Sequence, residues 1–406
     1  MAEPQVRFKK DDGSSYPAWN DVVLGDIATR VTRKNTNGET NRPLTIASIE
    51  GLVDQRTYFG KTIASKDMSG YYLLKNGEYA YNKSYSAGYD YGSIKRLDKY
   101  DMGALSTLYI CFALNKDQNT DFYDCYFNGL SWYNQMPQIC AEGARNHGLL
   151  NVSPNDFFKI WLSVPSSKEE QQKIADFLSS VDDVISTSAQ EVANLETQKK
   201  AVMKKVFSQE VRFKKADGSG FPEWEETTIG AIGDVITGST PSTKDAGNYG
   251  HDFCFCAPGD LGNGKYVVNT EKKVSEKGFK SGRAVPGGSV LATCIGSTIG
   301  KMGMAGCDMI TNQQINSIIV KEDDSEYVYY AIGYCFPQYL SSVGKQAVPI
   351  LSKSEFSKKL FPLPCLEEQH LIADFLSDFD EAIAAAKKEL ELWKELKKGL
   401  LQQVFV

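Results

Sequence analysis

The residues of this 406-residue chain that could do chemistry are hydrogen-bonding side chains gathered in a few loops. Residues 81–96, YNKSYSAGYDYGSIKR, interleave tyrosines with basic residues, and residues 143–148, GARNHG, form a glycine-bounded turn. Residues 237–249, 296–301 and 311–314 collect hydroxyls, amides and lysines. Arg and Lys suit guanine O6 and N7, Asn and Gln suit adenine N6 and N7, and hydroxyls suit phosphate. These loops therefore predict contacts with double-stranded DNA.

The candidate contacts are the basic, amide, hydroxyl and tyrosine side chains of these loops, with two further lysines. Each one taken alone could equally be a solvated loop position, so the prediction rests on their clustering. The candidate DNA-binding residues are Lys34, Lys83, Ser84, Tyr85, Tyr89, Lys95, Arg96, Arg145, Asn146, His147, Ser239, Thr240, Ser242, Lys244, Tyr249, Ser297, Thr298, Lys301, Gln313 and Lys345.

The sequence offers no recognisable catalytic set. Residues 296–302, GSTIGKM, have three residues between the glycines where a phosphate loop has four, and Met where Ser or Thr would bind magnesium. The FCFC run at 253–256 has no second ligand pair and is typical of core packing rather than of zinc binding. The three histidines suggest no triad, and no glycine-rich cofactor fingerprint follows a strand. We expect no catalytic, cofactor or metal site in this chain.

The elements that must position the loops occur twice. Residues 6–19 and 211–224 are identical at ten of fourteen positions. Residues 169–178, EEQQKIADFL, match residues 367–376, EEQHLIADFL. The stretches between these blocks have similar lengths but little resemblance to each other. A duplicated frame with diverged inserts predicts a pseudo-twofold molecule that holds two different reading domains.

Bulk properties leave several classes of partner open but exclude a membrane protein. The net charge is −6, yet insert 20–164 holds 15 basic and 15 acidic residues, and insert 225–363 holds 13 and 14. A basic DNA-binding face can therefore exist within a near-neutral insert. No apolar run approaches the ~20 residues that span a bilayer, and no signal peptide is evident. Nine scattered cysteines without CxxC pairs indicate reduced thiols in the cytoplasm.

Each repeated block opens a long helix. After Pro165, SSKEEQ provides a capping signal, and the apolar positions that follow recur every 3.5 residues on average, which is the coiled-coil period. Neither seam could be buried alone, so we expect the two helices to pack as an antiparallel coiled coil. The seams are Val181, Ile185, Ser188, Val192, Leu195, Lys199, Val202 and Val206, and Phe379, Ile383, Ala386, Leu390, Trp393, Lys397, Leu400 and Val404.

Such a helix pair could act as a ruler, because ~28 helical residues span roughly 42 Å, a little more than one turn of B-DNA. The lysine in each seam, Lys199 or Lys397, could set the helix register or contact a partner protein. The first helix runs into VRFKK, whereas the second ends in QQVFV and its missing VRFKK stands at the N-terminus. We therefore expect the two termini to lie close together in a circular arrangement.

The inserts favour mixed α/β domains of short strands with few helices, and residues 122–133 and 327–340 are the candidate helices. The fold class is therefore α+β: two mixed domains separated by two long helices, with internal pseudo-twofold symmetry. The expected segments are 1–20, the N-terminal part that completes the repeat; 21–165, the first reading domain; 166–210, the central helical region; 211–224, the repeat of the N-terminal segment; 225–364, the second reading domain; and 365–406, the C-terminal helical region.

This combination resembles the specificity subunit of type I restriction–modification systems. The resemblance covers essentially the whole chain and rests on the two EEQ-x-x-IADFL helices and on W-x-x-x-x-(I/L)-G at each insert entrance, Trp19 to Gly25 and Trp224 to Gly230. GSTPS (238–242), SVLATCIGSTIGK (289–301) and NQQ (312–314) are weaker family phrases.

The resemblance implies a non-catalytic subunit whose two target-recognition domains each read one half of a bipartite, asymmetric DNA site. It implies methyltransferase subunits as partners, usually two, which bind S-adenosylmethionine themselves, and a possible restriction subunit that uses ATP and Mg. Two alternatives from other classes are an enzyme that carries its own recognition half, and a non-DNA-binding scaffold or adhesin-like protein with duplicated arms. The missing cofactor motifs disfavour the enzyme, and the cysteine pattern and helix length disfavour the scaffold.

Overall fold

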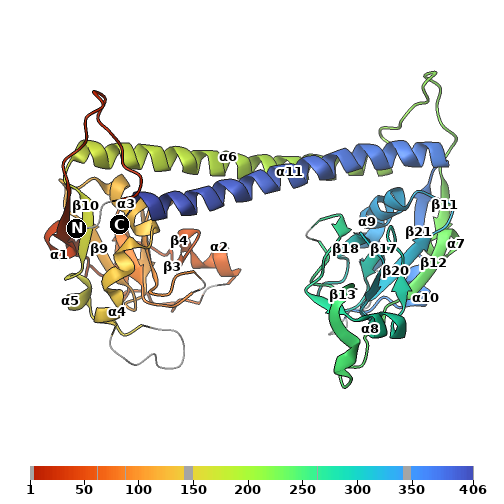
Figure 1. The fold of residues 1–406 in the computed structure, drawn as a ribbon, viewed down its shortest axis with the longest axis horizontal. Helices are drawn as coiled ribbons and strands as arrows, with labels where there is room; N and C mark the ends of the chain where they lie inside the picture. Colours follow the sequence, from red (N-terminus) through yellow and green to blue (C-terminus); the bar gives the residue numbers. More distant parts are fainter. Residues whose placement is uncertain are drawn as a thin grey trace. The chain divides into compact units, whose positions relative to one another are not determined.

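The computed structural model describes residues 4–61, 63–86, 88–140, 150–262, 264–341 and 349–405 (Figure 1). The chain forms two compact units: unit 1 is Met1–Thr187 with Leu390–Val406, and unit 2 is Ser188–Glu389. Two long helices, α6 (Lys168–Phe207) and α11 (Leu366–Val404), each contribute residues to both units.

The recognition domain of unit 1 is built on an antiparallel four-stranded sheet. Its strand order is β2 (Ala28–Arg30), β9 (Ile110–Leu114), β6 (Tyr79–Asn82) and β7 (Ser93–Arg96). Two ribbons accompany the sheet: β3 (Leu44–Ala47) with β4 (Gly51–Asp54), and β5 (Tyr72–Lys75) with β8 (Met102–Leu105). Helix α2 (Gln55–Phe59) follows β4, and helix α3 (Thr120–Asn128) follows the sheet.

The recognition domain of unit 2 contains two sheets. The first has the order β12 (Gly233–Thr237), β20 (Ile315–Val320), β17 (Val290–Thr293), β18 (Met302–Ala305) and β14 (Tyr266–Val267). The second has the order β15 (Lys272–Val274), β13 (Tyr249–Cys256), β19 (Met309–Thr311) and β16 (Ala284–Val285). Helices α8 (Glu276–Ser281) and α9 (Ser325–Ser341) complete the domain.

The two recognition domains share a scaffold that their sequences do not reveal. Order β2-β9-β6-β7 in unit 1 corresponds to β12-β20-β17-β18 in unit 2, and in both the last two strands form an antiparallel hairpin. The same backbone hydrogen bond ties each hairpin to a later segment: Leu150 N donates to Lys83 O at 2.8 Å, and Leu351 N donates to Cys294 O at 2.8 Å. Loops 83–92 and 294–301 therefore occupy equivalent places.

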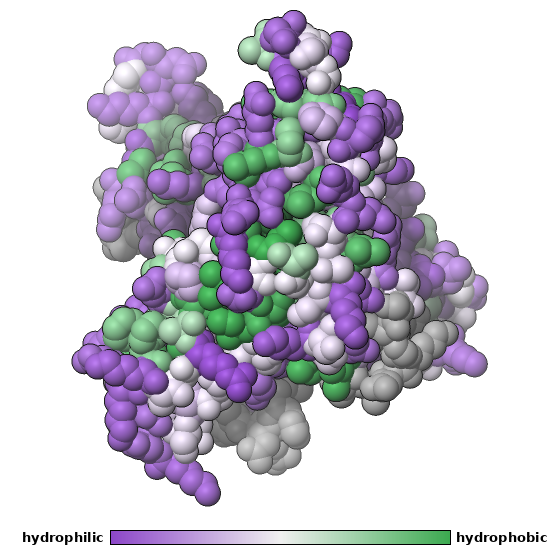
Figure 2. Space-filling model, turned by 90° about the vertical axis from the view of Figure 1, so that its right-hand side faces the viewer, coloured by the Kyte–Doolittle hydropathy of each residue, from purple (hydrophilic) through white to green (hydrophobic). Residues whose placement is uncertain are grey.

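Each domain is closed by a pair of antiparallel strands that also leads into the long helix. In unit 1, β1 (Trp19–Val23) pairs with β10 (Trp161–Pro165). In unit 2, β11 (Glu225–Thr228) pairs with β21 (Leu360–Leu363). Short helices flank both pairs: α1 (Leu24–Ile27), α5 (Pro154–Phe157), α7 (Ile229–Ile232) and α10 (Lys353–Ser357). Figure 2 views the end of unit 2 and shows hydrophobic side chains gathered there among hydrophilic ones.

Most helix predictions are confirmed, and one needs correction. Helix α9 covers the predicted residues 327–340. The predicted helix 122–133 is instead two elements, because α3 ends where Gly129 N donates back to Cys125 O and Tyr126 O, and a separate 3-10 turn follows at Ser131–Gln135. Helix α4 (Met136–Ile139) comes next. In α6 and α11, every predicted seam position is buried or partly buried.

Candidate nucleic-acid interface and its frame

Two of the predicted loops in unit 2 come together. Thr240 Oγ1 donates to Gln313 Oε1 at 2.6 Å, and Ser239 N donates to Thr311 O at 2.8 Å. Gly238 allows this approach, because a Cβ at that position would collide with the carbonyl oxygens of residues 311 and 312. Loop 238–242 and loop 311–314 therefore form one polar surface, as the clustering argument expects.

Neighbouring groups hold this surface in place. Tyr249 OH donates to Pro241 O at 2.9 Å, and Asn248 Nδ2 donates to Ser242 O at 3.1 Å. The Tyr249 hydroxyl thus supports the loop from inside the domain. Lys244 lies on the same loop and is exposed.

Arg283 belongs to this surface, although the sequence did not single it out. Its guanidinium Nη1 donates to Thr237 O at 3.0 Å, and its backbone N donates to Ser239 Oγ at 3.0 Å. The side chain is exposed. It follows α8, more than forty residues after the loop that it joins, and no motif in the sequence connects the two.

The β17–β18 hairpin lies beside the same loops. Gln314 Nε2 donates to Ile295 O at 3.2 Å, which links the hairpin to loop 311–314. Gly296 has a φ of +99°, a conformation that favours glycine and turns the chain sharply at this point. Ser297 and Lys301 are exposed on the hairpin, and Thr298 is partly buried.

In unit 1 the equivalent hairpin presents the tyrosine-rich segment. Tyr89 N donates to Ser86 O at 2.8 Å to form its tight turn, and the Ser86 hydroxyl lies 2.9 Å from the Ser48 hydroxyl of the β3–β4 turn. Tyr85 is 59% exposed at the tip. Ser84 is partly buried beside it, where its backbone N donates to Asn82 Oδ1.

Two predicted lysines of unit 1 are not free at this tip. Lys34 Nζ donates to Gly70 O at 3.0 Å and lies over the Tyr72 ring, 3.8 Å from its centroid. Lys83 is partly buried, and this burial lowers its pKa. Both remain predicted contacts: Lys83 lies in the hairpin, and Lys34 lies against residues 70 and 72.

Lys95 and Arg96 lie against α3 rather than on the tip. Lys95 is buried, its Nζ donates to Asn128 Oδ1 at 2.5 Å, and burial lowers its pKa to about 8. Arg96 donates to Asp98 and Asp121, both at 2.7 Å. We leave these two residues out of the contact set proposed below. Arg145, Asn146, His147 and Lys345 lie outside the described residues.

A buried glutamate joins the repeated block to the long helix in unit 1. Glu170, at the start of α6, is fully buried. It accepts hydrogen bonds from Arg7 Nε at 2.8 Å and from Trp19 Nε1 at 3.4 Å. Phe8 of the same block packs edge-on against Phe177 of the helix, with ring centroids 5.5 Å apart. The paired arginine and indole satisfy a charge that would be costly to bury alone.

The same anchor recurs in unit 2. Glu368 of α11 is fully buried and accepts from Arg212 Nη2 at 2.8 Å and from Trp224 Nε1 at 2.9 Å. The hydrogen bond to Glu368 raises the pKa of Arg212. Phe213 packs edge-on against Phe375 at 5.6 Å. The two repeated blocks therefore make the same buried contacts, which accounts for the similarity of their sequences.

The predicted closure of the chain is confirmed within unit 1. Val6 N donates to Gln403 O of α11 at 3.1 Å, the equivalent of the bond from Val211 N to Lys205 O at 3.2 Å in unit 2. Phe405, which follows α11, packs against α3. The N-terminal segment thus takes the place of the chain that would continue α11.

The two seam lysines pair across the helices. In unit 2, Lys199 Nζ of α6 lies 2.5 Å from Asp380 Oδ1 of α11. In unit 1, Lys397 Nζ of α11 lies 2.5 Å from Asp182 Oδ1 of α6. Each pair joins the end of one helix to the beginning of the other, so both contacts are antiparallel. Of the two roles left open by the sequence, this pairing across the helices favours the register role.

Neither a cluster of metal-binding side chains nor a membrane-spanning apolar helix occurs among the described residues. No group of three or more His, Cys, Asp or Glu side chains among them could hold a metal ion. Cys254 and Cys256 are buried in the core, as the FCFC run predicts. In the described part of the chain, no helix is both long and apolar enough to cross a bilayer.

The type I restriction modification DNA specificity domain matches this chain twice, over residues 18–197 and 222–392. The chain belongs to this family. Each match begins near the tryptophan of a repeated block and runs through an insert into a long helix, so the family unit coincides with half of the duplicated frame.

Relatives and solved structures agree with the family. The chain is 35% identical over 208 residues to the type I restriction enzyme MjaIX specificity subunit of Methanocaldococcus jannaschii, a match that covers 49% of this chain and 48% of the relative. It is 27% identical over 300 residues to the putative type I restriction enzyme MjaX specificity subunit of the same organism, which covers 71% and 68%. The match to MjaIX thus spans about half of that relative's length.

Two solved structures have the same fold. A chain from a structure of the assembly and conformational transition of the type I R-M system matches with a TM-score of 0.59 and 17% identity, over 96% of this chain and 98% of that one. The type I restriction-modification S subunit of M. genitalium matches with a TM-score of 0.55 and 14% identity, over 100% and 99%. The predicted α+β architecture with an internal repeat is therefore confirmed.

Proposed function

We propose that this chain is the non-catalytic DNA-specificity subunit of a type I restriction–modification complex. Its two recognition domains, residues 21–165 and 225–364, each read one half of a bipartite, asymmetric DNA site. The helical regions 166–210 and 365–406 hold the two domains apart and so set the gap between the half-sites. The N-terminal segment 1–20 and its repeat 211–224 complete the frame.

The observation that carries this proposal is one scaffold with two different sets of loops. The β6–β7 and β17–β18 hairpins occupy equivalent places in the two domains, yet the first presents tyrosines and lysine and the second presents hydroxyls, amides and lysine. A shared scaffold favours the same kind of ligand in both domains. Different side chains favour different base sequences, because base edges are distinguished by the donors and acceptors they present.

The proposed contact set follows from the placement of the loops. In the first domain it contains Lys34 and the residues of hairpin 83–92. In the second it contains the surface formed by loops 238–249 and 311–314, the hairpin 296–301, and Arg283. The near-neutral charge of both inserts does not determine the number of phosphate contacts, and partner subunits add contacts of their own in this proposal.

Partners supply the chemistry in this proposal. Adenine-N6 methyltransferase subunits, two in number, bind to the conserved helices and carry S-adenosylmethionine. A restriction subunit that uses ATP and Mg can join the complex, which acts in the cytoplasm. Because an adenine inside duplex DNA is stacked, the methyltransferase flips it out, while this chain provides the sequence reading.

The test is the methylome of a methylation-free host that expresses this chain with the methyltransferase subunit of its system. The expected result is a split, asymmetric motif methylated at adenine, which is absent when either protein is omitted. A stable complex that produces no new motif contradicts the proposal and favours a scaffold. Methylation by this chain alone contradicts the non-catalytic assignment.

A further inference from the structure

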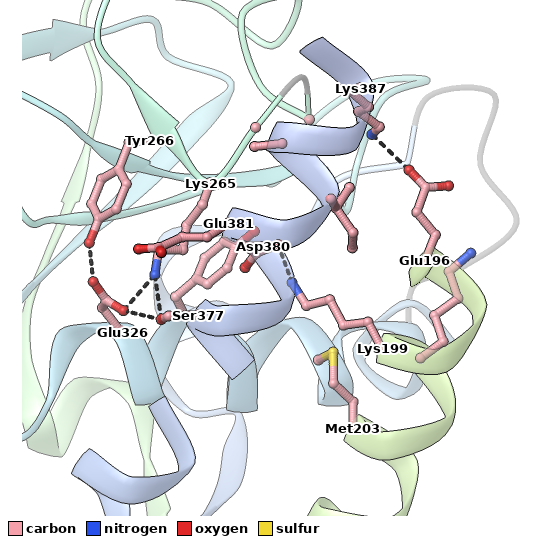
Figure 3. A pocket seen from close by; sticks show the side chains of 16 residues that line it. Glu196, Lys199, Met203, Lys265, Tyr266, Glu326, Ser377, Asp380, Glu381 and Lys387 are labelled. Atoms are coloured by element: carbon pink, nitrogen blue, oxygen red, sulfur yellow. Dashed lines mark hydrogen bonds and ion pairs between the residues drawn. The ribbon is translucent and has the colours of Figure 1, made fainter. Parts of the chain in front are cut away.

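One lysine in unit 2 lies at the centre of a buried polar network. The Lys265 side chain is 8% exposed, and its Nζ donates to Glu326 Oε2 at 2.5 Å, to Ser377 Oγ at 2.7 Å and to Tyr330 OH at 3.4 Å (Figure 3). Tyr266, the next residue, also donates its hydroxyl to Glu326. A buried ammonium group with three oxygen partners has its hydrogen-bonding capacity satisfied.

The partners of Lys265 come from different elements. Glu326 and Tyr330 belong to α9 of the recognition domain, whereas Ser377 belongs to α11. Tyr330 OH continues the network to Asp380 Oδ2 at 2.5 Å, and Asp380 pairs with Lys199 of α6. One chain of hydrogen bonds therefore connects the segment before β14, α9 and both long helices.

A cavity lies beside this network. It has a volume of about 680 Å³ and is lined by both long helices, by α9 and by the segment before β14. Met203, Tyr329 and Ile383 supply part of its wall. Close packing normally fixes how elements lie on one another, and here a cavity interrupts that packing. The orientation of the recognition domain on the long helices consequently depends more on the directed hydrogen bonds of Lys265 and Glu326.

The Glu326 carboxyl group is ionised at neutral pH. Burial alone would raise the pKa of Glu326, but the hydrogen bonds from Lys265, Ser377 and Tyr266 outweigh it, and the net effect lowers the pKa from its ordinary value of 4.5. The carboxylate therefore accepts these bonds over the whole neutral range. In Figure 3 the groups that face it are Lys265 before β14, Tyr266 in β14 and Ser377 in α11.

The corresponding place in unit 1 is more open. Asp182, the equivalent of Asp380, has a side chain that is 48% exposed, compared with 24% for Asp380. The seam pair of unit 2 is thus embedded in contacts with a recognition domain, while that of unit 1 faces solvent on one side. The hydrogen bond from Tyr330 of α9 to Asp380 ties the seam pair of unit 2 to its recognition domain.

We propose that Lys265 and Glu326 are positioning residues that fix the second recognition domain on the long helices and so restrict the gap between the half-sites. This inference rests on the proposed function. Successive base pairs of B-DNA are 3.4 Å apart along each strand. A tilt of the domain at its attachment moves its reading loops by a distance of this size. If the attachment is loosened, the protein therefore tolerates gaps that are one base pair shorter or longer.

The test uses the double variant Lys265→Met/Glu326→Gln in the complex with its methyltransferase. Changing both residues avoids leaving one buried charge without its partner. Substrates carry the two wild-type half-sites with the gap shortened or lengthened by one or two base pairs, and the fraction methylated is measured for each. In the variant, methylation of sites whose gap is changed by one base pair should rise about tenfold relative to methylation of sites with the wild-type gap. A tenfold change corresponds to the free energy of one or two hydrogen bonds.

The matched control is Lys387→Met/Glu196→Gln. This ion pair, with a distance of 2.7 Å, also borders the cavity but joins α11 to α6 without the recognition domain. Its removal should leave the gap profile unchanged. A second double variant, Lys265→Gln/Glu326→Gln, keeps polar side chains at both positions and provides a milder form, which should shift the profile in the same direction if the first double variant unfolds.

The outcomes separate the possibilities. A relaxed gap with unaltered bases in both half-sites supports positioning. An unchanged gap profile in a folded variant overturns it, because the expected effect is then missing. A change in the bases of the second half-site also overturns it, because the network would then take part in base reading. A wild-type complex that yields no split motif instead contradicts the proposed function itself.

Discussion

The two units repeat the same anchor but differ in how the chain enters it. In unit 2, the block that carries Arg212 continues directly from α6, so both its ends are tethered. In unit 1, the block that carries Arg7 begins the chain and meets α11 through the hydrogen bond from Val6 to Gln403. The contacts to the buried glutamate are otherwise the same.

The difference shows that the frame depends on side-chain contacts and not on a peptide bond at this joint. A buried carboxylate requires its partners, and the retained arginine, tryptophan and phenylalanine supply them whether or not the backbone is continuous. Continuity should matter for local opening instead. A segment that no peptide bond joins to its helix gains more conformational freedom when its contacts are lost.

The largest expected effect follows from removing an anchor. Glu170→Ala and Glu368→Ala should each destabilise their unit by about 3 kcal/mol, the scale for breaking a buried ion pair. Amide hydrogen exchange should then distinguish them: residues 4–16 open in the first variant, whereas 211–224 stay more protected in the second. Chemical denaturation gives the free energies, and equal exchange in both blocks would contradict the role of tethering.

The next effect concerns the loops, and it sharpens the difference between the domains. Arg283→Ala and Gln313→Ala should alter the second half-site only, while Tyr85→Ala should alter the first only. A single base contact discriminates by about 1–3 kcal/mol, so the preferred base should lose roughly tenfold or more in selectivity. Motif analysis of the methylated DNA measures this, and a change in the opposite half-site would break the assignment of the domains.

A smaller effect should separate the two seam pairs. Lys199→Met should cost about 1–2 kcal/mol because its partner Asp380 is largely enclosed, whereas Lys397→Met should cost less than about 1 kcal/mol because Asp182 faces solvent. Thermal unfolding of both variants provides the comparison. A larger loss for Lys397→Met would show that exposure does not control the strength of these pairs.

The smallest effect depends on pH and concerns Lys95. Its pKa of about 8 lies below the ordinary value of 10.5, since burial disfavours the charged form. The unfolded chain therefore binds more protons between about pH 8 and 10.5, and this group makes stability rise with pH across that window. Lys95→Met also loses the hydrogen bond to Asn128, so its net gain in stability at pH 7 should be only about 1 kcal/mol and should become a loss by about pH 10. Parallel pH profiles of the two proteins would refute this.

The two long helices and the repeated blocks were predictable from the sequence, because helices produce a regular spacing of apolar residues and the repeats can be read directly. Positions such as Val181 and Ile383 recur every three or four residues, and the structure buries them. The termini could be placed together for the same reason, since the repeat shows which segment is missing after α11. Glu170 could not be recognised, because its partner Arg7 lies 163 residues away.

The shared scaffold of the inserts was not predictable from one sequence. Strands β6, YAYN, and β17, VLAT, occupy the same place with different side chains, because backbone hydrogen bonds define the strand order and tolerate many residues. The burial of Lys95 was not predictable for a related reason. It follows a tyrosine-rich loop, but the strand carries its side chain to the buried side against α3.

The discontinuity of unit 1 has a consequence for synthesis on the ribosome. Unit 2 is a single stretch, Ser188–Glu389, whereas unit 1 needs Leu390–Val406 in addition to the first 187 residues. At a synthesis rate of 5–20 residues per second, about 10–40 s pass between the synthesis of the first recognition domain and that of the helix end that carries Phe405. Throughout that interval Phe122 and Tyr126 lack the ring that covers them in the finished protein. The nascent chain thus completes unit 2 before unit 1, although most of unit 1 is synthesised first.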